Sequence, residues 1–94
     1  MSNRITEAHL ESVCKTINRT MGTPEEPYTK DDSGKYHANI GNYHIDGAYG
    51  GVALEQMLND GGGVRSVFSC GHVTKRDLIH RMRAFLSGVA ATKQ

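Results

Sequence analysis

The stretch that decides the fold is VTKRDLIHRMRAFLSGV, residues 73–89. Thr74 and Asp77 form the pattern of a helix capping box, and Val73 is placed to pack on Leu78 as a hydrophobic staple. The apolar residues that follow share one helical stripe: Leu78, Ile79, Met82, Phe85, Leu86 and Val89. The pattern predicts a helix over residues 75–87. Because so short a helix is only marginally stable alone in water, its stripe has to pack on the rest of the chain.

A second apolar stripe lies near the start of the chain and predicts a helix over residues 7–21. Thr6 precedes it as a cap, Ile5 can pack on Leu10, and Gly22 ends it. The stripe consists of Leu10, Val13, Cys14, Ile17 and Met21. Cys14 is therefore expected to be a small buried core residue.

Between the two helices the chain is rich in glycine, and its hydrophobic period changes to two. Nine of the 11 glycines lie between Gly34 and Gly71. Residues 36–40 and 43–46 alternate as strands do, and Gly41-Asn42 between them fits a two-residue hairpin turn. In this register four pairs face each other across the strands: Ile40 with Tyr43, Ala38 with Ile45, His37 with Asp46, and Asn39 with His44.

The secondary structure of the rest of the region between the helices is predicted from the positions of its glycines and prolines. Residues 23–33 are expected to be a loop. Residues 52–58 (VALEQML) fit a helical face or a strand, and the glycines on both sides favour a strand. Residues 64–68 are expected to form a short edge strand. The prediction is an α+β fold of order α-β-β-β-α, with both helices on one face of an antiparallel sheet.

Length and composition limit the class of protein. Ninety-four residues make one domain, with residues 1–5 and 90–94 expected to be frayed. The opening MSNRITEAHLESVCK has no apolar run typical of a signal peptide, and no stretch is apolar enough to span a membrane. We expect a cytosolic protein with no membrane partner, in which Cys14 and Cys70 are free thiols. A core this thin and an open sheet edge also predict a homodimer.

The charges are divided along the chain. Residues 1–63 carry five basic and nine acidic side chains, a net charge of −4, whereas residues 64–94 carry six basic and one acidic, a net charge of +5. On the last helix Arg76, His80 and Arg83 fall within about 60° of each other. We predict that this cationic stripe, with Lys75 and Arg65, binds a partner; Arg81 lies on the other flank. The partner is a protein or, as the alternative, a nucleic acid.

Other patterns that suggest chemistry are weaker. GAYGG and DGGGV do not match a phosphate-binding loop and are expected to be tight turns. Cys70, His72 and His80 could meet near the last helix, but Cys70 and His72 are closer in sequence than zinc ligands usually are, so metal binding stays open. No third group orients a Cys70 nucleophile and a His72 base. The sheet face with His37, His44 and Asp46 is a secondary binding face. We expect no enzymatic activity and no cofactor.

Three blocks of the sequence resemble a group of small accessory proteins encoded by tailed bacteriophages and prophages. The blocks are IGNYHIDGAYGG (residues 40–51), NDGGGV (59–64) and GHVTKRDL (71–78), and the resemblance covers residues 35–88. It implies a viral accessory protein that acts in the cytoplasm of a bacterial host. Small proteins of this category often bind and block a host enzyme or a defence complex. The resemblance implies no activity for any particular residue.

Overall fold

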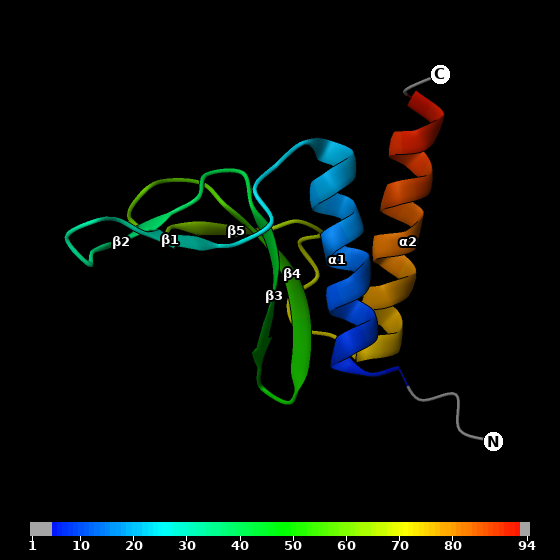
Figure 1. The fold of residues 1–94 in the computed structure, drawn as a ribbon. Coiled ribbons are helices and arrows are strands. Elements are labelled where there is room, and N and C mark those ends of the chain that lie inside the picture. Colours follow the sequence, from blue (N-terminus) through cyan, green and yellow to red (C-terminus); the bar gives the residue numbers. More distant parts are fainter. Residues whose placement is uncertain (1–4, 93–94) are drawn as a thin grey trace.

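The computed structural model describes residues 5–92, which form two helices and five strands (Figure 1). The order is α1 (Glu7–Met21), β1 (Tyr28–Lys30), β2 (Tyr36–Ala38), β3 (Tyr43–Ala48), β4 (Gly51–Met57), β5 (Val64–Ser66) and α2 (Lys75–Thr92). The predicted α+β class and both helices are confirmed. Helix α2 continues to Thr92 instead of ending near residue 87. Of the ends that we expected to fray, residues 1–4 and 93–94 lie outside the described residues.

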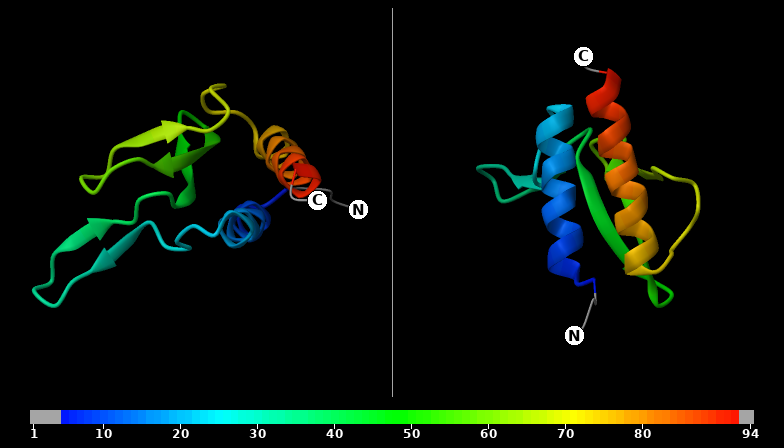
Figure 2. Two further views of the ribbon diagram at one scale, coloured as in Figure 1. Left: turned by 90° about the horizontal axis from the view of Figure 1, so that it is seen from above. Right: turned by 90° about the vertical axis from the view of Figure 1, so that its right-hand side faces the viewer.

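The two helices lie side by side, run in the same direction and cover one face of the β3–β4 pair (Figures 1 and 2). Both begin at the predicted caps. The Thr6 hydroxyl accepts a hydrogen bond from the His9 amide at 3.3 Å, and the Thr74 hydroxyl accepts one from the Asp77 amide at 3.1 Å. Gly22, with a φ of 72°, ends α1 in the left-handed conformation that favours glycine.

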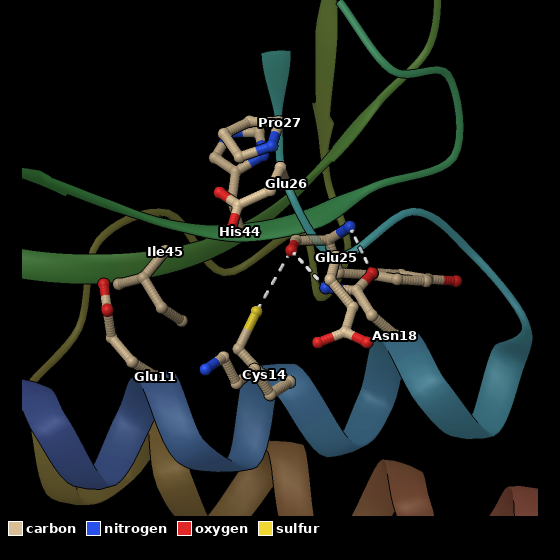
Figure 3. A pocket seen from close by; sticks show the side chains of 10 residues that line it. Glu11, Cys14, Asn18, Glu25, Glu26, Pro27, His44 and Ile45 are labelled. Carbon is tan, nitrogen blue, oxygen red and sulfur yellow. Dashed lines mark hydrogen bonds between the residues drawn. The ribbon is translucent and has the colours of Figure 1, made fainter. Parts of the chain in front are cut away.

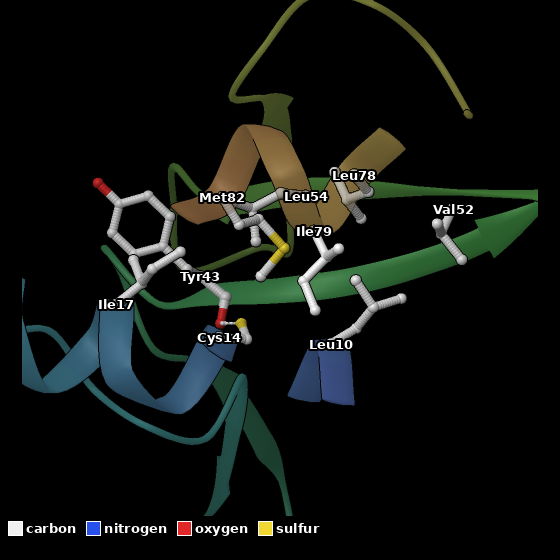
Figure 4. Packing of buried hydrophobic residues seen from close by; sticks show 9 residues of the cluster. All are labelled: Leu10, Cys14, Ile17, Tyr43, Val52, Leu54, Leu78, Ile79 and Met82. Atoms are coloured by element: carbon white, nitrogen blue, oxygen red, sulfur yellow. Dashed lines mark hydrogen bonds between the residues drawn. The ribbon is translucent and has the colours of Figure 1, made fainter. Parts of the chain in front are cut away.

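The hydrophobic core lies between these helices and the sheet (Figure 4). It is built from both predicted stripes and from β3 and β4: Leu10, Cys14, Ile17, Tyr43, Val52, Leu54, Leu78, Ile79 and Met82. Cys14 is 6% exposed, which confirms its prediction as a core residue. The Phe85 ring of α2 extends the core by packing against Tyr43 and Phe68.

The predicted hairpin of residues 36–46 is wrong. Strand β2 pairs with β1, which lies in the expected loop of residues 23–33, and β3 pairs with β4. The strands therefore form two antiparallel sheets, of orders β1-β2 and β3-β4-β5, in place of the predicted single sheet. None of the four predicted cross-strand pairs forms, because residues 36–40 and 43–46 belong to different sheets.

Gly41 and Asn42 lie in the segment that connects β2 of one sheet to β3 of the other. The Asn42 side chain is fully buried, and its Nδ2 donates to the Pro24 carbonyl at 2.8 Å. The Gly41 amide donates to the Met57 carbonyl at 2.9 Å. The true hairpin turn is Tyr49-Gly50, between β3 and β4, where both residues have positive φ values, 54° and 73°, as a type I′ turn requires.

The strand predicted over residues 52–58 is confirmed as β4, and the predicted edge strand is β5. After β5 the chain returns to the free side of β4, where Val52 and Val73 exchange two backbone hydrogen bonds of 2.8 Å. Gly51 allows this approach, since a Cβ at that position would lie 2.9 Å from the Val73 carbonyl oxygen. This bridge places the start of α2 over the sheet.

One part of the molecule projects away from the helices (Figure 2). We call it the arm: the β1–β2 hairpin (residues 28–38) and the β4–β5 turn with β5 (residues 57–66). The two hairpins touch through the Ala38 amide, which donates to the Asp60 carbonyl at 3.3 Å. The arm and its junction with β3 expose several large apolar side chains: Tyr28, Tyr36, Ile40, Leu58 and Val64.

Candidate functional site

The exposed face of α2 carries most of the predicted partner-binding residues. Lys75, Arg76, His80 and Arg83 are all exposed, while the opposite side of the helix is buried through Leu78, Ile79 and Met82. Arg76, His80 and Arg83 follow one another at intervals of four and three residues, so they lie along one side of the helix. The structure thus brings four of the five predicted residues onto one helix.

Arg65 and Arg81 do not add to this face in the same way. Arg65 lies on β5 in the arm, away from α2 (Figure 1), and its Nε donates to the Gln56 side-chain oxygen at 3.0 Å. Arg81 forms an ion pair with Asp77 one turn earlier, with 3.2 Å between Nε and Oδ1. Lys75, Arg76 and Arg83 are the other formal positive charges of α2, and all three side chains are exposed.

The sheet face that the helices leave uncovered carries two pairs of histidine and carboxylate. His44 and Asp46 point to this face from β3, as the alternation of a strand requires. His44 Nε2 lies 3.4 Å from Glu55 Oε1, and His72 Nε2 lies 2.8 Å from Asp46 Oδ2. Since an ionised carboxylate only accepts hydrogen bonds, Nε2 of His72 is the donor to Asp46.

His37, the third member of the predicted secondary face, lies elsewhere. It belongs to β2 in the arm, where its ring is 2.8 Å from Asp31 Oδ2 and 3.5 Å from Asp60 Oδ1. The hydrogen bonds to Asp31 and then Asp60 raise the pKa of His37 above its ordinary value. Hydrogen bonds from the Ser33 hydroxyl, His37 and the Lys35 amide lower the pKa of Asp31 well below its usual range. This cluster holds the tip of the β1–β2 hairpin.

A pocket of about 280 Å³ opens between α1, β3 and residues 25–27 (Figure 3). At its base the Asn18 side chain forms two hydrogen bonds with the backbone of Tyr43, each 2.9 Å long. The Cys14 thiol donates to the same Tyr43 carbonyl at 3.1 Å. Burial, and then the negative charge of Glu11, raise the pKa of the Cys14 thiol to about 12. Cys14 therefore stays protonated at neutral pH and is no nucleophile in this pocket.

In residues 5–92 the structure does not bring together the residues of the hypothesised metal site, and it does not pair Cys70 with His72. In residues 5–92 no three histidine, cysteine or acidic side chains converge as metal ligands. His72 has the third group that the sequence did not identify, Asp46, but the Cys70 thiol donates to the Gly71 carbonyl at 3.7 Å instead of to His72.

The glycine-rich turns use their amides internally. Asn59 Oδ1 accepts hydrogen bonds of 3.0 Å from the amides of Gly61 and Gly63, the position an anion would take in a phosphate-binding loop. This turn is therefore closed by its own side chain. The other cluster, GAYGG, forms the Tyr49-Gly50 hairpin turn.

Neither the Asp46–His72 pair nor the exposed Tyr49 was predicted from the sequence. Asp46 and His72 are 26 residues apart and meet only because the Val52–Val73 bridge brings the second segment beside β4. Tyr49 is 96% exposed at the tip of the β3–β4 hairpin, and its ring makes a T-shaped contact with the His72 ring. The glycines that follow Tyr49 are a signal for a turn at Tyr49-Gly50. Pairing β3 with β4 in the prediction would have placed the turn there.

No family model, curated protein or solved structure matches this chain. In the part of the chain that the structure describes, no helix is both long enough and apolar enough to cross a membrane.

Proposed function

We propose that this protein is a non-enzymatic phage accessory protein that binds a host or phage protein through the basic face of α2 and modulates it in the bacterial cytoplasm. The observation that carries the proposal is the exposure of Lys75, Arg76, His80 and Arg83 on a helix whose other side is fixed in the core. A cationic face on a rigid element suits an acidic surface of a partner, because it steers association and sets the orientation of the complex. The phage origin and the host partner rest on the resemblance of the three sequence blocks.

A protein partner is favoured over a nucleic acid by the charge of the whole molecule. The formal net charge is +1 and the pI about 7.8, whereas nucleic-acid-binding domains are usually strongly basic. No exposed Phe, Tyr or Trp side chain stands among the cations of α2 as a platform for a base. Nucleic-acid binding is therefore an outcome that the experiment should detect, and not the leading proposal.

The test is recovery of tagged protein from lysate of the infected bacterium, with and without nuclease, followed by reconstitution with the purified partner. The variant is Arg76→Ala with Arg83→Ala, and the matched control is Arg81→Ala, which removes a cation from the other flank of α2. We expect a nuclease-resistant protein partner whose affinity falls at least tenfold in the double variant, about 1.4 kcal/mol, and changes little in the control. Circular dichroism verifies that both variants are folded.

Two results would contradict the proposal. Equal affinity of the double variant and the wild type would show that the α2 face does not bind the partner. Release of the captured material on nuclease treatment would favour the nucleic-acid alternative. In that case the double variant should flatten the log–log dependence of affinity on salt by about one unit for each phosphate that it no longer binds.

A further inference from the structure

The outer edge of β3 carries backbone groups that no other strand uses. In the antiparallel β3–β4 ladder, Ile45 lies opposite Leu54 and Gly47 opposite Val52. Leu54 and Val52 direct their backbone groups away from β3, since the Leu54 carbonyl accepts from the Val67 amide at 3.0 Å and Val52 is bonded to Val73. In such a ladder the residues opposite them also point outward. The N–H and C=O groups of Ile45 and Gly47 therefore face the open edge, and within residues 5–92 they have no hydrogen-bond partner.

The first position of the same edge shows how such groups are satisfied. Tyr43 lies two residues before Ile45, so its backbone faces the same way. There the Asn18 side chain accepts from the Tyr43 N–H and donates to its C=O, as a neighbouring strand would. Asn18 closes the edge at Tyr43 and leaves it open at Ile45 and Gly47.

The pocket beside α1 lies directly along this edge. Ile45, Glu11 and Cys14 line one part of it, and residues 25–27 close it at the Tyr43 end (Figure 3). Gly47 is exposed and has no side chain to hinder an approaching chain. We call the outer edge of β3 from Tyr43 to Gly47 the groove. The pocket walls it on the α1 side at Ile45 and closes it at Tyr43, whereas Gly47 lies in a second hollow that Glu7 and Lys75 also line.

The rim of the groove is acidic. Glu11, Glu25 and Glu26 line the pocket, with Lys15 as the one cation among its lining residues. Glu25 is paired with Arg19, with 3.5 Å between Oε2 and Nε. In the described chain no cation lies within ion-pair distance of Glu11 or Glu26, so these two carboxylates are available to a basic ligand.

We propose that the outer edge of β3 accepts an extended, basic segment of a partner protein as an added strand. The segment would exchange backbone hydrogen bonds with Ile45 and Gly47, while a lysine or arginine side chain reaches Glu11 or Glu26. Strand addition of this kind takes affinity from the backbone and specificity from alternate side chains. The site is separate from the basic face of α2, and the inference does not depend on the function proposed for that face.

A second copy of this chain fits the groove less well than a basic segment. Pairing β3 with β3 of another copy about a two-fold axis would bring two acidic rims to one interface, and like charges there cost binding energy. The charge of the rim therefore favours a basic partner over self-association.

The experiment uses a capped five-residue peptide of alternating valine and lysine as the probe, followed by amide NMR of the whole protein. Two peptides serve as controls: one with glutamate in place of lysine, and one N-methylated at the amides that would face β3. We expect the lysine peptide to shift the Ile45 and Gly47 amides and to slow their hydrogen exchange. N-methylation should weaken binding at least tenfold, because it removes donors of the added strand. Glu26→Gln should weaken it several-fold, whereas the matched change Asp32→Asn, on the arm, should not.

Other outcomes would overturn the inference. These are equal binding of the lysine and glutamate peptides, unchanged binding after N-methylation, shifts confined to residues outside the groove, and absence of binding at millimolar peptide. Sedimentation showing a dimer in which Ile45 and Gly47 are protected without peptide would assign the edge to a second copy instead.

Discussion

The arm and the helical half of the molecule, which consists of α1, α2, β3 and β4, are stabilised in different ways. In the helical half, nine buried side chains from α1, α2, β3 and β4 pack into one cluster. In the arm, short strands are held by turns in which a side chain such as Asp31 or Asn59 accepts several backbone amides. The arm leaves its tyrosines largely exposed, with Tyr36 at 64%. Apolar burial is cooperative over the whole helical half, whereas the turns of the arm are local, so the arm should open more easily.

The largest expected effect on the free energy of unfolding comes from truncating one large side chain in each part of the molecule. Ile79 is fully buried, so Ile79→Ala should reduce the free energy of unfolding by about 2–5 kcal/mol. Tyr36→Ala in the arm should change it by no more than about 0.5 kcal/mol, because Tyr36 is mostly exposed. Urea denaturation of both variants measures the difference. Similar destabilisation of the two variants would show that the arm belongs to the same cooperative core.

A smaller effect is expected at Asn18, which links α1 to the edge of β3. Asn18→Ala leaves the buried Tyr43 N–H without its acceptor and should cost about 1–3 kcal/mol. Hydrogen exchange of the Tyr43 amide should accelerate at the same time. Thr16→Ala, at an exposed position of the same helix, is the control and should leave the Tyr43 amide as protected as in the wild type. Unchanged protection in Asn18→Ala would show that another group satisfies this edge.

The smallest effect is a pH dependence confined to the arm. The raised pKa of His37 gives stability that is fully present below its ordinary value of about 6.5 and is lost as the pH rises through the raised pKa. The lowered pKa of Asp31 gives stability that is present above about 3.9 and is lost as the pH falls through the lowered pKa. The hairpin tip should therefore be most ordered between these two ordinary values.

Titration of the His37 ring by NMR checks this prediction. The midpoint should lie above about 6.5 in the wild type and fall toward it in Asp31→Asn. Asp32→Asn removes a neighbouring acid that forms no hydrogen bond with His37 and should leave the midpoint in place. An unchanged midpoint in Asp31→Asn would contradict the assigned cause of the shift.

The sequence determined the helices and their caps. Each helix has a stripe of apolar residues at a period of 3.6 and a capping threonine, and both signals are local, so the bounds of α1 and the start of α2 were predicted correctly. The exposure of Lys75, Arg76, His80 and Arg83 followed from the same period, since the side of the helix opposite the apolar stripe must face solvent. The strand predicted over residues 52–58, observed as Gly51–Met57, followed from the glycines around it.

Only the tertiary structure decided which strands pair and which distant residues meet. Alternation predicted strands at residues 36–40 and 43–46, but the pattern is the same for any pairing partner. Gly41-Asn42 was therefore predicted to be a hairpin turn, whereas in the structure it connects two different sheets. The Asp46–His72 pair and the open edge at Ile45 and Gly47 depend on the order β3-β4-β5 and on the Val52–Val73 bridge. Pairing is a long-range choice set by the burial of β3 and β4 beneath two helices, and a local pattern carries no information about it.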